Sequence, residues 1–337
     1  MPKALMWVAG ALVALLLVGF GGRWYAGRVM SQRAVTPEVL GNETPASVQL
    51  PFTRVAVASG DRTLIGWWVK ARGEGTAPAP AVLFLHGNVS TIADYVTLQR
   101  FLYRQGISSF VFDYTGFGGS SGSASLRNAV ADAGRVAQAF ADSAGKTARR
   151  VAMGSGLGAT VLLQAIDSVQ PHVNGIVVEG VDASVKEAAI RSGRLPKVIG
   201  AVVADIGDNV AAAANVRVPA LFVHSKEDNR APVAGAERVL AAVPSKAGLV
   251  MHWRKGHSAI LASSKACDWA PVIAFVKTGA LPAAKVDSTD ACAAAKATAD
   301  SAAARAAALA VAQAKAGAAR TKSGTKPPAK APTKRRD

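Results

Sequence analysis

The sequence is poor in cysteine, in long hydrophobic runs and in acidic residues. Only two cysteines occur in 337 residues, which excludes a disulfide-dense scaffold and a four-cysteine zinc module. Cys267 and Cys292 would suffice for one disulfide in an oxidising compartment, and the sequence leaves their pairing open. A single long apolar run excludes a polytopic transporter. Neither a metal-ligand spacing nor a dinucleotide-binding G-x-G-x-x-G fingerprint occurs, so we expect no metal and no cofactor.

The shortage of acids gives a formal net charge of +17, from 39 Lys+Arg against 22 Asp+Glu. Most of this excess lies at the two ends of the chain. Residues 293–337 hold ten basic and two acidic residues, and residues 1–33 hold four basic residues and no acid. The C-terminal stretch has no aromatic side chain on which a base could stack. We therefore expect no sequence-specific nucleic-acid partner.

Residues 291–337 form a basic tail rich in alanine, lysine and proline. Its first part has high helix propensity but few large apolar side chains, so we expect a marginal, solvated helix there. The Lys/Pro tract after Gly317 cannot pack a core and is expected to be disordered. Charge alone would let the tail contact anionic surfaces, and the alternative is a solubilising tail without a partner.

Residues 1–33 are predicted to be a membrane anchor and its flank. Ala4–Gly22 carries no charge, and as a helix this run would be about 28 Å long, against roughly 30 Å of bilayer hydrocarbon. Trp7, Trp24 and Tyr25 lie near its ends, as is typical of the membrane interface. The alternative is a cleaved signal peptide, but the run is long for one and the nearest small-x-small site, at 19–21, is poor.

The side of the membrane on which the rest of the chain lies is less clear from the sequence. Arg23, Arg28 and Arg33 outnumber Lys3 and the α-amino group, which favours a cytoplasmic body by the positive-inside rule. A very short N-terminus before the apolar run is instead typical of a segment that exports the rest of its chain. We favour the extracytoplasmic side.

Residues 34–290 have the pattern of one α/β domain. Two alternating segments are followed by short apolar runs, which are typical of a parallel sheet covered on both faces. The expected strands are Phe52–Ser59, Leu64–Lys70, Ala81–Leu85, Ser108–Phe112, Arg150–Met153, Gly175–Val178, Ala220–Val223 and Gly248–Met251. Helix-like stretches lie roughly at 91–104, 125–142, 157–168, 232–242 and 269–277. The predicted fold is a mostly parallel, doubly wound sheet with helices on both faces, and an insertion at about 182–216 is expected to cap a ligand site.

Four motifs follow expected strands in sequence order. They are LFLHGN (Leu83–Asn88), FDYTGFGGSSG (Phe112–Gly122), VAMGSGLGAT (Val151–Thr160), and PALFVHSKEDNRAP (Pro219–Pro232) with KGHS (Lys255–Ser258). Together they resemble the α/β-hydrolase superfamily, in particular its serine aminopeptidase-, esterase- and thioesterase-like members, over about residues 50 to 280. The resemblance implies an α/β-hydrolase fold, Asp228 as catalytic acid and His257 as general base. It also implies that the backbone N–H groups of Leu157 and of Asn88, or Gly87 beside it, form an oxyanion hole.

The nucleophile elbow departs from that family pattern. Such an elbow reads G-x-S-x-G, because small flanking residues let the strand and helix approach at a strained turn. Residues 154–158 read G-S-G-L-G, which places Gly156 at the nucleophile position and Ser155 one residue early. Taking Ser155 as nucleophile would put Met153 and Leu157 where small residues belong.

Two functional hypotheses arise from this departure. In the first, the protein is a hydrolase of esters, thioesters or peptides, in which Ser155 enters through a rearranged elbow or His257 activates water directly. In the second, it is a catalytically inactive member that binds an acyl or peptide ligand, or a partner, at the membrane.

Overall fold

The structure is a computed structural model that describes residues 19–73, 77–146, 148–257, 260–261, 263, 266–282 and 286–287. The chain divides into two units, Met1–Ala291 and Cys292–Asp337, and every described residue belongs to the first. Most of the predicted anchor at 4–22, the tail at 291–337 and Cys292 lie outside the described residues. The predictions made for them stay predictions.

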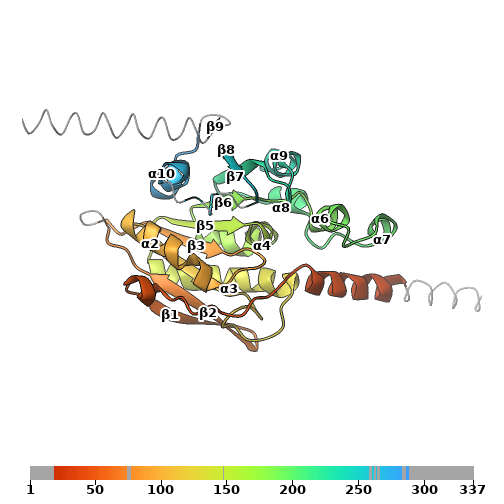
Figure 1. The fold of residues 1–337 in the computed structure, drawn as a ribbon, viewed down its shortest axis with the longest axis horizontal. Helices are drawn as coiled ribbons and strands as arrows, with labels where there is room; N and C mark the ends of the chain where they lie inside the picture. The colour runs from red at the N-terminus through yellow and green to blue at the C-terminus, as the bar shows by residue number, and fades with distance from the viewer. Residues whose placement is uncertain are drawn as a thin grey trace, which may run out of the picture. The chain divides into compact units, whose positions relative to one another are not determined.

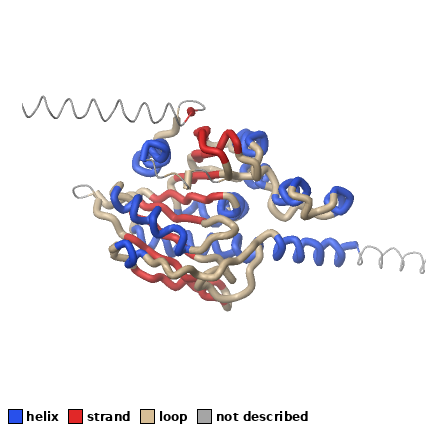
Figure 2. Tube along the Cα trace, viewed as in Figure 1, coloured by secondary structure: helices blue, strands red, loops and turns tan. Residues whose placement is uncertain are grey.

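A nine-stranded sheet forms the centre of the first unit, with the strand order β1-β2-β4-β3-β5-β6-β7-β8-β9 (Figures 1 and 2). The strands are β1 (Thr53–Ser59), β2 (Arg62–Val69), β3 (Ala81–Leu85), β4 (Ser108–Phe112), β5 (Arg150–Ser155), β6 (Gly175–Glu179), β7 (Ala220–Glu227), β8 (Ala247–Lys255) and β9 (Val286–Asp287). β2 is antiparallel to β1 and β4, and the remaining pairs are parallel. The expected mostly parallel sheet is confirmed; β9, with two residues, is too short to give a periodic signal.

Alternate residues of the central strands enter two separate cores, one on each face of the sheet. In β3, Leu83 and Leu85 belong to one core, whereas Val82 and Phe84 belong to the other. All five residues of β3 are buried, because helices cover both faces. This is why the sequence reads as a continuous apolar run there and not as an alternating one.

The helices divide between the two faces. They are η1 (Pro45–Val48), η2 (Ile92–Tyr95), α2 (Val96–Arg104), α3 (Leu126–Ala144), α4 (Leu157–Gln164), α5 (Ile166–Val169), η3 (Gln170–His172), α6 (Val185–Arg191), α7 (Lys197–Val202), α8 (Asn209–Ala213), α9 (Val233–Ala241), η4 (Ala266–Trp269) and α10 (Ala270–Thr278). Helices α3, α4 and α9 pack into one core, and α2 and α10 pack into the other. The predicted doubly wound arrangement is thus present.

The insertion at 182–216 folds into three short helices, α6 to α8, which the sequence pattern alone did not resolve. Two of them begin at side-chain caps: Ser184 accepts the N–H of Glu187, and Asp208 accepts the N–H of Ala211. The two N-cap residues, Ser184 and Asp208, also form an isolated antiparallel β-bridge, which closes the insertion at its base. Asn209 anchors it to α4 through a 3.0 Å hydrogen bond from Nδ2 to the Thr160 hydroxyl.

Residues 19–33 form a helix that precedes the domain. The N–H of Arg127, at the start of α3, donates to the Ser31 hydroxyl at 2.9 Å, which ties the end of this helix to the domain. No helix within the described part of the chain is both long enough and apolar enough to cross a bilayer.

The contact between α4 and β3 depends on Gly158. A Cβ at this position would lie 1.9 Å from the carbonyl oxygen of Leu85. We expect Gly158→Ala to lower the free energy of unfolding by about 1–3 kcal/mol or more, because two backbones would have to separate. Urea unfolding measures this, with Gly119→Ala as the matched control, since a Cβ there lies 3.6 Å from Ile65. Equal stability of the two variants would contradict the close approach.

Candidate active site

The turn between β5 and α4 has the geometry of a nucleophile elbow. Gly156 is the single residue between the end of the strand and Leu157, and it has φ 56° and ψ −110°. This conformation is strained for a residue with a side chain, and in this superfamily's motif a serine carries that strain. Gly154 permits the tight approach of strand and helix, because a Cβ there would lie 2.3 Å from the carbonyl oxygen of Gly158. The backbone of the elbow is therefore present, with a glycine at its apex.

Asp228 and His257 come together at the carboxyl ends of β7 and β8. The Nδ1 atom of His257 lies 2.8 Å from Oδ2 of Asp228, while Oδ1 accepts the backbone N–H groups of Arg230 and Ala231, each at 2.8 Å. Burial alone would raise the pKa of Asp228, but the hydrogen bonds from His257, Ala231 and Arg230 outweigh it and lower that pKa. The charged carboxylate holds the Nδ1 proton, which leaves Nε2 as the basic atom of the ring.

The free edge of the imidazole faces the elbow. Nε2 of His257 lies 2.8 Å from the point where a Cβ on Gly156 would stand. A side chain at residue 156 would therefore press against the ring, which would have to move by a few tenths of an ångström or more. Nε2 therefore faces the position from which the nucleophile side chain of a serine hydrolase would extend.

Ser155 lies in a different environment. It is fully buried as the last residue of β5, and its register partner on β6 is Glu179. Its hydroxyl is hydrogen-bonded to the Glu179 carboxyl. The structure thus brings Asp228, His257 and Gly156 together, and directs Ser155 into the protein behind the elbow.

Glu179 is a site residue that none of the sequence motifs indicated. It is 1 % exposed, its main-chain carbonyl accepts the N–H of Gly156 at 3.0 Å, and its Oε1 accepts the N–H of Ile260 at 2.9 Å. One carboxyl therefore links the elbow to the segment that follows His257. Burial raises its pKa to about 7, against the hydrogen bonds from Ser155 and Ile260. Its only sequence signal was its place at the end of an apolar strand.

This raised pKa predicts a pH dependence of stability. Between its ordinary value of 4.5 and about 7, the folded carboxyl keeps a proton that the unfolded chain loses. The folded state then binds more protons, so its stability falls as the pH rises through this window, by about 3 kcal/mol in total. We expect Glu179→Gln to remove this contribution. As the pH rises from 5 to 8, the free energy of unfolding should therefore fall less for the variant than for the native chain.

Urea unfolding at several pH values measures the difference. The control is Glu187→Gln, because Glu187 is a half-exposed surface acid paired with Arg238. This control should follow the pH dependence of the native chain. A Glu179→Gln variant with the native pH slope would show that the buried carboxyl titrates normally.

The loop after β3 supplies the other side of the site. The N–H of Gly87 donates to the Tyr95 hydroxyl at 3.1 Å, so the candidate oxyanion donor in this loop is the N–H of Asn88. The side chain of Asn88 is held by residues 34–36: Oδ1 accepts the N–H of Thr36 at 2.7 Å, and Nδ2 donates to the carbonyl of Ala34 at 3.4 Å. Leu157, the first residue of α4, is the second candidate donor, since the first N–H groups of a helix have no intrahelical partner.

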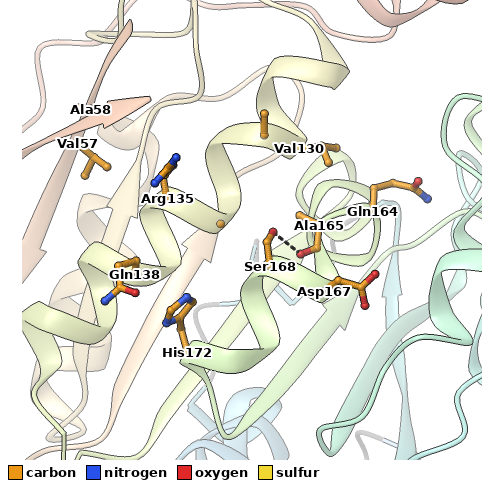
Figure 3. A pocket seen from close by; sticks show the side chains of 12 residues that line it. Val57, Ala58, Val130, Arg135, Gln138, Gln164, Ala165, Asp167, Ser168 and His172 are labelled. Carbon is orange, nitrogen blue, oxygen red and sulfur yellow. Dashed lines mark hydrogen bonds between the residues drawn. The ribbon is translucent and has the colours of Figure 1, made fainter. Parts of the chain in front are cut away.

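A groove of about 580 Å³ lies elsewhere on the domain (Figure 3). Its lining residues come from β1, α3 and the α4–α5–η3 segment, and they include Arg135, Gln138 and His172. None of the lining residues belongs to the set around Gly156 and His257. The groove and the candidate active site are therefore separate features.

Comparisons with known proteins identify the family to which the chain belongs. The serine aminopeptidase (S33) family matches residues 76–203, and the TAP-like protein family matches residues 204–291. The uncharacterized protein Rv2307c of Mycobacterium tuberculosis (strain H37Rv) is 30% identical over 217 residues, which cover 63% of this chain and 75% of that protein. The chain belongs to the α/β-hydrolase superfamily.

Other comparisons are more distant. An uncharacterized membrane protein of Saccharomyces cerevisiae, YNL320W, is 24% identical over 147 residues, covering 43% of this chain and 51% of that protein. Among solved structures, the Pyrococcus furiosus esterase Pf2001 superposes with a TM-score of 0.54 at 19% identity, covering 66% of this chain and 91% of that one. Acetyl xylan esterase 1 from Thermoanaerobacterium gives a TM-score of 0.50 at 17% identity, covering 71% and 88%. At these identities the two esterases show the α/β-hydrolase fold alone.

Proposed function

We propose that this chain is a membrane-anchored α/β-hydrolase that cleaves an acyl bond with a water activated by His257, without a serine nucleophile. The observation that carries the proposal is the position of Nε2 against Gly156, with Nδ1 held by Asp228 at 2.8 Å. A base oriented in this way can take a proton from a water bound at the elbow. The matched serine aminopeptidase family and the Pyrococcus furiosus esterase support a peptide or ester acyl bond as the substrate class.

The proposed reaction needs no covalent intermediate. Nε2 of His257 takes a proton from water while the water oxygen attacks the acyl carbon. The carbonyl electron pair moves to the oxygen, which accepts hydrogen bonds from the N–H groups of Leu157 and Asn88. When this oxyanion collapses, the bond to the leaving group breaks, and the imidazolium returns the proton to the leaving atom. The products are a carboxylic acid and an alcohol, thiol or amine.

The test is ester hydrolysis by the purified full chain in the presence of a fluorophosphonate, which reacts covalently with activated serines. The proposal expects turnover of short p-nitrophenyl esters that the fluorophosphonate does not block, and no covalent labelling of the protein. Inhibition together with labelling that disappears in Ser155→Ala would instead favour a rearranged elbow with Ser155 as nucleophile.

A second candidate function is ligand binding without turnover. It is favoured by the full burial of Ser155 and by the absence of a hydroxyl at residue 156. This alternative expects no hydrolysis of any acyl substrate, and a rise in melting temperature with non-hydrolysable acyl or peptide analogues.

The anchoring part of the proposal rests on the uncharged run at 4–22 and on the membrane assignment of the yeast relative. We propose that the domain lies on the extracytoplasmic side and that the basic tail contacts anionic surfaces there.

A further inference from the structure

Exposed apolar side chains are concentrated on two elements of the described chain. On the helix at 19–33, Phe20, Trp24 and Tyr25 are 75%, 51% and 65% exposed. On α7, Val198 and Ile199 are 82% and 51% exposed. Groups of large apolar side chains exposed to water are typical of surfaces that contact a membrane or another protein.

The two elements belong to one side of the domain. Figure 1 shows α6, α7 and the helix at 19–33 extending beyond the sheet towards the same end. The segment after α7 returns to this helix, where a Cβ on Gly27 would lie 3.9 Å from Cγ2 of Ile206. The cap is therefore in contact with the helix that leads out of the predicted anchor.

The charged residues nearest in sequence to these apolar groups are basic. The helix at 19–33 carries Arg23, Arg28 and Arg33 and no acid, and the guanidinium of Arg28 lies 5.9 Å from the centre of the Trp24 ring. Residues 191–199 likewise contain basic residues and no acid, and Arg194 and Lys197 in this stretch are exposed. Aromatic and aliphatic side chains bordered by arginine and lysine are typical of a surface that enters the headgroup region of an anionic bilayer.

The sequence also identifies where that bilayer would begin. The uncharged run from Ala4 ends at Gly22, within the first turn of the described helix and just before Trp24 and Tyr25. Interfacial aromatics at this point would place the membrane surface near residues 22–25. An exposed apolar helix on the same side of the domain is then close to the same surface.

We propose that α7 is a second membrane contact, with Val198 and Ile199 inserted in the surface of an anionic bilayer beside Trp24 and Tyr25. This inference rests on the membrane anchor of the proposed function and adds the cap to it. The cap reaches the candidate site through the end of α6, because Nη2 of Arg191 donates to the carbonyl of Arg230 at 2.6 Å, and the N–H of Arg230 holds Asp228. A bilayer-bound cap would thus adjoin the Asp228–His257 pair.

The test places a fluorescent label on α7 of the full chain. Val198→Cys carries an environment-sensitive dye, and the chain is reconstituted in phosphatidylcholine vesicles containing phosphatidylglycerol, with or without brominated acyl chains. Val39→Cys is the matched control, since Val39 is an equally apolar residue that is 89% exposed on the segment after the helix. Ile199→Cys gives a second reading on α7, and the native chain treated with the same dye gives the background signal.

We expect the brominated lipid to quench the dye at 198 and 199 but not at 39. Equal quenching at 198 and 39 in vesicle-bound protein would overturn the cap contact while leaving the anchor intact. Failure of the chain to float with vesicles would overturn the anchor and the cap contact together. A dye at 198 that is shielded from aqueous iodide but insensitive to brominated lipid would show that a protein, or a second copy of the chain, covers α7, which also overturns the proposal.

Discussion

Replacing His257 with alanine should lower the rate of ester hydrolysis by about 10²- to 10⁴-fold, the range typical of a lost general base. The loss should appear in kcat with little change in KM, because the imidazole acts on the attacking water and not on the bound substrate. Asp228→Asn should lower kcat in the same direction, since Oδ2 of Asp228 orients the ring from 2.8 Å. Steady-state kinetics with p-nitrophenyl esters measures both variants.

His172→Ala is the control for this experiment. His172 lies in η3, at the groove formed with α3, and makes no contribution to the site around Gly156. Its variant should keep the native kcat and KM. A His257→Ala variant with the native rate would contradict the proposed mechanism, because the activity would then come from another part of the chain.

Gly156→Ser should convert the site to one that a fluorophosphonate labels. The serine would occupy the elbow at φ 56°, with its Cβ initially 2.8 Å from Nε2 of His257, so the ring must shift to restore a normal contact. The hydroxyl would then lie within hydrogen-bonding reach of the base that Asp228 orients. We expect ester turnover to rise by at least about tenfold, which corresponds to about 1.4 kcal/mol of barrier, and stability to fall by about 1–3 kcal/mol through backbone strain.

The matched control is Gly156→Ala, which adds the same Cβ without the hydroxyl. It should lose a similar amount of stability and remain unlabelled. Labelling of Gly156→Ser but not of Gly156→Ala, measured by intact-protein mass spectrometry, would show that the elbow is intact and lacks only its nucleophile. A folded Gly156→Ser variant that stays unlabelled would mean that the surrounding site no longer supports acyl transfer.

The strands were predictable because burial on both faces produces apolar runs in the sequence, and β3 and β4 begin and end at the expected residues. The elbow was predictable for a local reason, since Gly154, Gly156 and Gly158 lie within five residues. Asp228 and His257 were identified from the order of the motifs along the chain. Their side chains meet at 2.8 Å although the two residues are 29 positions apart in the sequence.

The remaining contacts in the site join residues that are far apart in the sequence, so no local sequence pattern indicates them. Glu179 meets the N–H of Ile260 across 81 residues, and Asn88 meets Thr36 across 52. A glutamate at the end of a strand is normally exposed, so its burial behind the elbow depends on how the segment after His257 folds over it. The position of the His257 ring against Gly156 likewise depends on how closely the turn between β5 and α4 approaches the loop after β8, which no local sequence pattern determines.

The hydrogen bonds between Asn88 and residues 34–36 have a practical consequence for protein production. A shortened chain that starts at β1 would keep the sheet but would lose the segment that fixes the Asn88 side chain. It would also lose the carbonyl of Glu38, which accepts the N–H of Gly118 at 2.9 Å. Shortened versions intended for assays or crystallisation should therefore begin before Ala34, because residues 34–36 fix the side chain of Asn88.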